Sequence, residues 1–565
     1  MASDLDKRTS SRPGAARRTW LLIVFIFGIL VTMHLVLPQL FSFSSKSGSN
    51  EDAVYTNRHL KPKNYLNLTD LRRDEEDGKD NPFEFCSVRG GEGDRVGSTY
   101  GNVALSQSRI HLGSGSRVRR VISKALAGQP VTISVLGGSV SACHGAGDDP
   151  ISPKCYPSRF FQWWNTVFPH PASELTNGAM RRTTSEYFGY CSTHHIPDVA
   201  DLIVVELDAS DSPDNAREMT DHFEVLIRSL LLRPDTPAVL LLGHFSPQLH
   251  KAWGSFGADH YHNVVAQFYD VPHLSTKSIL FTDYMKKPKS INRFYADPIL
   301  ANPAGHQLIT DVLIAYFQTQ ICDVWEDWVG GGSGQAQGGA LGGGGAGLFG
   351  GIGQRKGVPE PHPNHLDGHE EVEVDAEGNR IKLGLPKGAG LEFQSSPYAV
   401  PAGRMNTRPD DERLFEEISP FCVSANDLVN PLPPSLFQGT GWSAYHPTAS
   451  GGGDILNTKS HYWYSTLAGS KLRIPVMVGA GDIGVYYLAS GSGEGSEVKC
   501  QVDDNYGGAK TLKNVIPGLP DEETPRLAII DHFVARGNHF VECTLVGDEE
   551  EKGVPVFKIT GIFTT

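Results

Sequence analysis

Hydrophobic residues follow two different periods in two parts of the chain. From about Phe83 to Trp328, short apolar runs typical of buried strands alternate with segments of helical periodicity. The runs are Val131–Leu136, Leu202–Leu207 and Ala238–Leu242, and helices are expected over Met219–Leu231 and after Pro303. Strands that alternate with helices predict a mostly parallel sheet covered on both faces, which makes residues 83–328 a three-layer α/β domain.

After residue 393 the period changes to two. Leu472, Ile474, Val476 and Val478 alternate with polar or small residues, as do Val541, Cys543 and Leu545. Further short strands are expected at Ile483–Leu488, Glu497–Val502, Leu527–Val534 and Val554–Phe563. This pattern predicts an antiparallel β-sandwich over residues 393–565. Cys500 and Cys543 share the inward parity of their strands, so they form either a disulfide or two buried thiols.

A glycine-rich tract separates the two domains. Glycine occupies 15 of the 28 positions from Gly330 to Gly357. Such a segment buries too little side chain to offset its conformational entropy. We therefore assign residues 329–392 to a linker. Within it, His362, His365 and His369 follow no predicted strand or helix, and we expect a solvated loop there.

An apolar segment near the N-terminus predicts a membrane anchor. Trp20–Phe41 holds 22 residues without a charged side chain, long enough for a helix to span a bilayer. The alternative, a cleaved signal peptide, has a shorter apolar core and a small-residue cleavage site, which is not evident here. Five Lys or Arg residues precede the segment, so the tail 1–19 is expected in the cytosol. The rest would lie in the secretory lumen or at the cell surface, as in a type II membrane protein.

Residues 42–82 are polar and are expected to form a stem that carries the sequon Asn67-Leu68-Thr69, a candidate N-glycosylation site. The eight cysteines lack metal-binding spacing, and in an oxidising compartment they predict disulfides, among them a bridge from Cys143 to Cys155. We predict no metal site and no cofactor. The net charge of −14 makes nucleic acid an unsuitable partner, and the oligomeric state stays open.

Candidate chemistry begins where a buried strand ends. The run VTISVL leads into Gly137-Gly138-Ser139, and a sharp turn at glycine would place the serine hydroxyl at the carboxyl edge of the sheet, where α/β sites form. A plain strand-to-helix turn with a capping serine is the alternative. Further along the chain, Asn177-Gly178, the segment DLIVVELDASD and the segment FYADPILANPAGH follow in order.

With these segments the chain resembles the SGNH (GDSL-like) hydrolases over about residues 110–325, a family of flavodoxin-like esterases that often act on acetylated carbohydrates. It also resembles their fungal membrane-anchored, capsule-associated branch, whose likeness extends to GWSAYHP and GAGDIGVYYL. The resemblance implies Ser139 as the nucleophile. It also implies that Gly178, with its neighbour Asn177, and Ser210 stabilise the oxyanion. Asp297 matches the aspartate of the last block.

The chain departs from this family at its general base. Where the family has histidine three residues after the aspartate, this chain has Leu300. His306 lies in the first turn of the following helix and is our candidate base, with Asp297 to fix its tautomer. His144 and His244 are further candidates. Ser210 replaces an asparagine, and Arg181 and Arg182 replace small residues.

Two functions follow as hypotheses. The first is an esterase or O-acetyltransferase that acts on cell-wall or capsule polysaccharide through Ser139, with water or a sugar hydroxyl as acceptor. The second is a catalytically degenerate SGNH fold that binds or scaffolds polysaccharide. A purely structural membrane protein is a third class. Aromatic residues of the second domain could stack on sugars or fill its core: Trp442, Tyr445, Tyr462, Trp463 and Tyr464.

Overall fold

The structure is a computed structural model that describes residues 57–67, 81–87, 93–330, 398–408, 415–426, 438–447, 455–479, 481–547 and 553–565, and the strands β7 (Val372–Val374) and β8 (Arg380–Lys382). The predicted tail, membrane segment and most of the linker lie outside these residues. No helix within the described ranges combines the length and apolarity that a bilayer span requires.

A six-stranded sheet forms the centre of the first domain, in the order β1-β6-β5-β4-β2-β3. Strands β2 to β6 are parallel, and β1 adds an antiparallel edge. The parallel order is that of doubly wound, flavodoxin-like sheets, so the α/β prediction is confirmed. The strands are β1 (Arg109–His111), β2 (Thr132–Gly137), β3 (Glu174–Asn177), β4 (Leu202–Glu206), β5 (Ala238–Gly243) and β6 (His273–Ser275).

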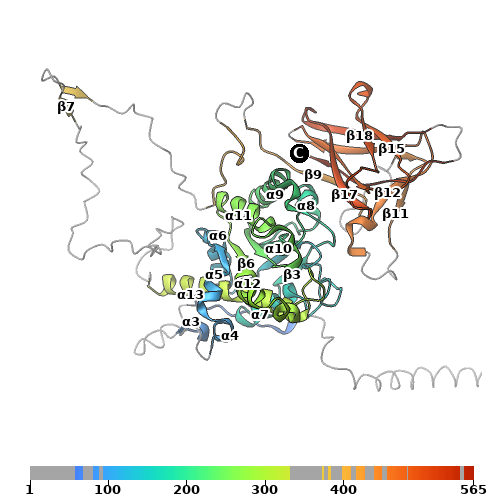
Figure 1. Cartoon of the computed structure of the whole chain (residues 1–565). Coiled ribbons are helices and arrows are strands. Elements are labelled where there is room, and N and C mark those ends of the chain that lie inside the picture. Colours follow the sequence, from blue (N-terminus) through green and yellow to red (C-terminus); the bar gives the residue numbers. More distant parts are fainter. Residues whose placement is uncertain are drawn as a thin grey trace, which may run out of the picture. The chain divides into compact units, whose positions relative to one another are not determined.

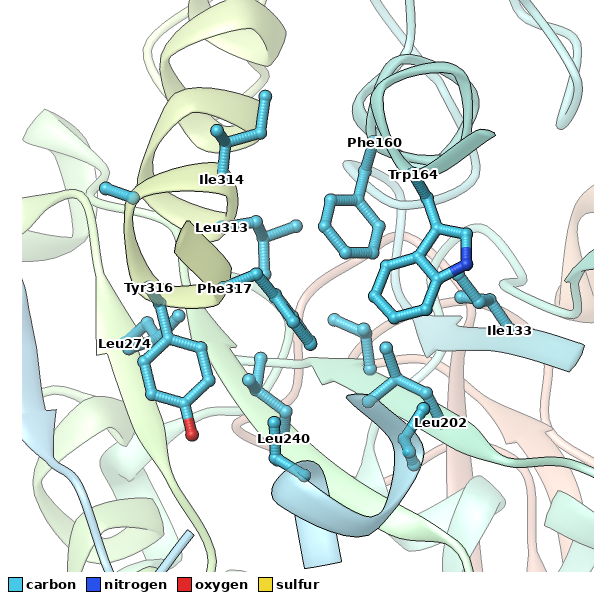
Figure 2. Packing of buried hydrophobic residues seen from close by; sticks show 14 of the residues in the cluster. Ile133, Phe160, Trp164, Leu202, Leu240, Leu274, Leu313, Ile314, Tyr316 and Phe317 are labelled. Atoms are coloured by element: carbon cyan, nitrogen blue, oxygen red, sulfur yellow. The ribbon is translucent and has the colours of Figure 1, made fainter. Parts of the chain in front are cut away.

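Helices cover both faces of this sheet because its buried strands alternate their side chains between the two faces. One face packs against α6 (Ser116–Leu126), α7 (Tyr156–Val167) and α13 (Pro303–Gly330). Figure 2 shows this core, with Trp164 and Phe317 meeting above Leu202 and Leu240. The other face packs against α8 (Ser185–Cys191), α9 (Ala216–Leu231) and α11 (Ala258–Phe268). Shorter helices complete the domain: α3 (Glu84–Ser87), α4 (Arg95–Tyr100), α5 (Asn102–Gln107), α10 (Pro247–Trp253) and α12 (Lys277–Lys286).

The second domain is the predicted antiparallel sandwich, drawn in orange and red in Figure 1. One sheet runs β10-β13-β18-β15-β16, with β10 (Gln438–Thr440), β13 (Lys471–Val478), β18 (Gly537–Leu545), β15 (Glu497–Val502) and β16 (Lys510–Lys513). The other runs β11-β12-β19-β14-β17, with β9 beside β19; its strands are β9 (Phe421–Ser424), β11 (Ser443–Tyr445), β12 (Tyr462–Ser465), β14 (Ile483–Ala489), β17 (Thr524–Asp531) and β19 (Phe557–Thr564). Trp442 and Trp463 fill the core, whereas Tyr445, Tyr462 and Tyr464 stay partly exposed.

All eight cysteines form disulfides: Cys86–Cys322, Cys143–Cys155, Cys191–Cys422 and Cys500–Cys543. Two of these pairs confirm the predictions from the sequence. Cys191–Cys422 joins α8 to β9 and thereby links the two domains covalently.

Two segments pack differently from their predicted place. Tyr65, assigned to the stem, donates its hydroxyl hydrogen to Val167 O at 2.5 Å and packs on the first core. Residues 398–408 and 415–420, assigned to the sandwich, include contacts with α9: Arg228 is ion-paired with Glu417 at 2.5 Å, and Met405 N–H donates to Glu224. Neither segment has a long apolar period, so these contacts could not be read from sequence patterning.

Candidate active site

Ser139 stands at the carboxyl edge of the sheet, immediately after β2. Because β2 and β4 are neighbours, with Gly137 opposite Glu206, the turn after β2 lies beside the turn after β4. A Cβ atom at Gly138 would lie 1.7 Å from Ser210 Oγ, so only glycine allows this approach. The structure thus brings Ser139 and Ser210 together. Ser139 is half-buried, and its Oγ accepts a hydrogen bond from Arg182 N–H at 3.2 Å.

The turn that follows Ser139 carries a histidine and its carboxylate partner. His144 N–H donates to Ser139 O at 3.0 Å, which folds the backbone back over the serine. His144 Nδ1 donates to Asp148 Oδ1 at 2.7 Å, and this hydrogen bond lowers the pKa of Asp148. The imidazole is 42% exposed. Cys143 and Asp148 hold positive φ angles of 63° and 58°, and the Cys143–Cys155 disulfide closes the loop.

The sandwich domain contacts Arg181, which precedes the residue whose N–H binds Ser139 Oγ. Arg181 N–H donates to Leu456 O at 2.7 Å, and Thr458 N–H donates to Arg181 O at 3.3 Å. The Arg181 side chain donates to Asp148 Oδ1 at 3.0 Å, so one residue ties the histidine loop to the sandwich. Beside it, Arg182 forms an ion pair with Glu522.

A lysine next to this ion pair is electrostatically perturbed. Lys459 Nζ lies 3.3 Å from Glu522 Oε1. Burial and the nearby Arg182 lower the pKa of Lys459 to about 8. The site is therefore bordered by charged groups from both domains.

The predicted base and its carboxylate are not joined to each other or to Ser139 by a hydrogen bond in the described residues. His306 is fully buried; its Nδ1 accepts from Tyr156 N–H at 3.3 Å, and its Nε2 has no hydrogen-bond partner among the residues that the structure describes. Burial, followed by the charges of His244 and Arg159, lowers the pKa of His306 to about 3. Asp297 Oδ1 instead accepts the N–H groups of Ile299 and Leu300 at 2.7 and 2.6 Å. Their catalytic roles stay predictions.

The predicted oxyanion donors make different contacts. Gly178 N–H donates to Val135 O at 2.9 Å within the sheet. The Asn177 amide donates to Ser141 O and Pro150 O at 2.8 and 2.9 Å, so it holds the histidine loop instead. Ser210 lies against Gly138 on the other side of the turn.

His144 also lies beside the position of the missing histidine. A Cβ at Gly145 would stand 3.6 Å from Leu300 Cβ and 2.7 Å from Ala301 O. The turn that carries His144 therefore contacts the loop that contains Leu300, the position at which the SGNH hydrolases have their catalytic histidine. The other candidate, His244, donates from Nε2 to Ile299 O at 2.8 Å, and burial lowers its pKa to about 4.

The sequence analysis named His144 as a candidate base but did not identify Asp148 as its hydrogen-bond partner. The signal was the spacing His-x-x-x-Asp in a loop with two glycines, yet the pairing depends on left-handed backbone at Cys143 and Asp148, which sequence patterns do not specify. A buried cluster was also missed: His262 lies between Asp208 Oδ1 at 2.6 Å and Asp211 Oδ2 at 2.9 Å.

No protein-family model matches the chain, and no curated protein matches it. Among solved structures, a two-domain esterase active on acetylated mannans, co-crystallised with mannopentaose, has a TM-score of 0.52 at 17% identity. The match covers 81% of this chain and 97% of that esterase. The two proteins share a two-domain fold. A second crystal structure with the same description gives 0.51 at 18% identity, over 81% of this chain and 98% of the other.

This two-domain fold agrees with the α/β domain and sandwich derived from the sequence. At such low identity the likeness concerns the fold alone. The chemistry has to be argued from Ser139 and the groups around it.

Proposed function

We propose that this chain is a serine esterase that removes acetyl groups from an O-acetylated polysaccharide. The observation that carries the proposal is the position of Ser139: its hydroxyl is accessible at the carboxyl edge of the sheet, bound to a backbone N–H and bordered by both domains. The overall likeness to an esterase active on acetylated mannans supports the substrate class.

In the proposed reaction, Ser139 Oγ attacks the acetyl carbonyl. A serine hydroxyl is a weak nucleophile and needs a neighbouring base to take its proton. We assign this role to His144, whose ring nitrogen Nε2 is not hydrogen-bonded to any described residue, while Asp148 fixes the tautomer from the other side. His144 then returns the proton to the leaving sugar hydroxyl, which leaves an acetyl-serine. Water, activated by the same imidazole, releases acetate.

Two groups are in place to stabilise the developing oxyanion. Arg182 N–H already points at Ser139 Oγ, and the Ser210 hydroxyl lies across Gly138. A donor of this kind contributes about 2.7–4 kcal/mol to lowering the barrier. Arg182 adopts a φ of 55°, an unusual conformation for a non-glycine residue that the contacts with the sandwich hold in place.

The test measures acetate released from acetylated mannan, and p-nitrophenyl acetate turnover, by the full-length chain. Ser139→Ala should lower kcat/KM by about 10³-fold or more and abolish labelling by a fluorophosphonate probe. Ser106→Ala, at an exposed serine of α5, is the matched control and should have no effect. Equal turnover in wild type and Ser139→Ala would refute the proposal.

If the folded wild-type chain neither turns over nor labels, the second hypothesis, a polysaccharide-binding module, replaces the first. Retention of the chain on an acetylated polysaccharide column would then identify that role. Acetyl transfer to an added sugar, at the expense of free acetate, would make the chain an O-acetyltransferase.

We further propose that Trp20–Phe41 anchors the enzyme as a type II membrane protein whose catalytic domain faces the secretory lumen or cell surface, where its substrate would be cell-wall or capsule polysaccharide. The four disulfides support an oxidising compartment. Asn67, exposed in the structure, would then carry a glycan, which a mobility shift on glycosidase treatment tests.

A further inference from the structure

Two glutamates and a histidine meet between α8 and α9. Glu186 is the second residue of α8, and Glu218 and His222 lie four residues apart on one face of α9. One oxygen of each glutamate and one ring nitrogen of His222 all lie within 4.8 Å of one another. None of these residues contributes to the esterase site described above.

The imidazole of His222 is the most informative member of this Glu-Glu-His cluster. The residue is 7% exposed, and its Nε2 has no hydrogen-bond partner within the described part of the chain. The nearest carboxylate oxygen, Glu218 Oε1, is 3.8 Å away, beyond hydrogen-bonding distance. A buried nitrogen in this state is costly unless something else binds it. Its Nδ1 faces the Tyr190 hydroxyl at 3.5 Å, and donation from Nδ1–H to that oxygen would leave the Nε2 lone pair available for a metal ion.

Glu186 brings a second ligand from the opposite helix. Its Oε1 accepts Leu527 N–H from β17 at 3.3 Å, so the carboxylate sits where the two domains meet. Arg526 acts on it as a positive charge, whereas Glu218 and Asp211 act as negative charges. Burial is the largest influence on the Glu186 carboxyl and opposes its ionised form. A cation bound beside it would offset this cost of burial.

We propose that Glu186, Glu218 and His222 bind one divalent transition-metal ion, with Zn²⁺ as the best fit. Two carboxylate oxygens and one imidazole nitrogen are a donor set that zinc accepts, with water as the fourth ligand. Magnesium and calcium prefer six or more oxygen ligands. Tetrahedral zinc needs its ligand atoms about 3.4 Å apart, so one group must move inward by roughly 1 Å. Glu218 can do this because its side chain is 47% exposed.

The bound ion would strengthen the contact between the two domains. It would join α8 to α9 directly and, through the Glu186–Leu527 hydrogen bond, to β17 of the sandwich. The Cys191–Cys422 disulfide already ties the far end of α8 to β9. Arg182, whose N–H donates to Ser139 Oγ, precedes Glu186 by four residues. The bound metal would therefore also restrain the short segment between Glu186 and Arg182.

The test uses the full-length protein, purified in mild detergent without a polyhistidine tag and stripped with EDTA. Added Zn²⁺ should bind with one-to-one stoichiometry by calorimetry and raise the Tm in a saturable manner. Co²⁺ in its place should give the visible absorption bands of a four-coordinate site. Mg²⁺ at the same concentration should change neither reading.

Glu218→Gln and His222→Gln should each weaken Zn²⁺ binding at least tenfold and remove the rise in Tm. Glu218→Gln is the more secure variant because its side chain is half-exposed. His539→Gln is the matched control: it changes another histidine–carboxylate pair, with Asp503, that belongs to no three-ligand cluster in the described part of the chain, and it should bind Zn²⁺ like wild type. Absence of Zn²⁺ binding in wild type, or equal binding by Glu218→Gln, would overturn the proposal. Since the readout is metal binding, it stands or falls independently of esterase activity.

Discussion

Two histidines at the same sheet edge are paired with aspartate, yet their surroundings prepare them for different tasks. His144 meets Asp148 at 2.7 Å and is 42% exposed, while His262 meets Asp208 at 2.6 Å and is fully buried. His262 also donates to Asp211, so both of its nitrogens are committed. His144 has one committed nitrogen among the described contacts and can still accept a proton. A histidine–aspartate pair is thus a catalytic candidate only where one nitrogen stays accessible.

The largest expected effect concerns His144. His144→Gln should lower kcat/KM for acetate release by about 10²–10⁴-fold, because general base catalysis contributes this much, and it should leave the Tm unchanged. Turnover of acetylated mannan and differential scanning calorimetry measure the two quantities. His539→Gln, which removes an equally short pair with Asp503 in the sandwich, is the control. If His144→Gln keeps full activity and His306→Gln loses it, the general base is His306, and the accessible nitrogen of His144 has no catalytic role.

The second effect is on stability and has a defined dependence on pH. Although burial alone lowers it, the hydrogen bonds to Asp208 and Asp211 raise the pKa of His262 to about 9. A folded pKa above the unfolded value of about 6.5 stabilises the protein fully below pH 6.5, and this stabilisation, about 3 kcal/mol, is lost as pH rises through 9.

His262→Gln should therefore lower the free energy of unfolding by about 3–5 kcal/mol at pH 6, since it leaves two buried carboxylates without their cation. Denaturant titrations at pH 6 and pH 9 measure both predictions. A wild-type stability that does not fall between these pH values would show that His262 is not the buried cation we describe.

The smallest effect concerns the ion pair between Arg182 and Glu522. Both side chains are about half-exposed or more, so Glu522→Gln should change the free energy of unfolding by less than about 1 kcal/mol. We expect a modest change in KM with an unchanged kcat, because the backbone hydrogen bonds at Arg181 hold the Arg182 N–H in place. A large fall in kcat would mean that the side-chain pair itself positions the oxyanion donor.

Much of the fold was accessible from the sequence. The runs Leu202–Leu207 and Ala238–Leu242 became β4 and β5, and Glu497–Val502 became β15, because hydrophobic period reports burial directly. Parity placed Cys500 and Cys543 on the inward faces of their strands, and of the two alternatives left open the structure has the disulfide.

The site was predictable only in part. Ser139 and Ser210 follow from strand ends, which local patterns reveal. The Arg181–Leu456 contact joins residues hundreds of positions apart, and the Asp148 carboxylate reaches His144 through an uncommon backbone conformation. Neither of these contacts produces a periodic pattern of residues in the sequence. His306 stays a candidate by spacing, and the core contacts of α13 place its ring in the interior.

The two hydrogen bonds between Arg181 and the segment at Leu456 and Thr458 involve main-chain atoms alone. These two hydrogen bonds place no requirement on the side chains at Arg181, Leu456 and Thr458, so substitutions there leave this part of the boundary intact. The Cys191–Cys422 disulfide across the same boundary, by contrast, is lost when either cysteine is replaced.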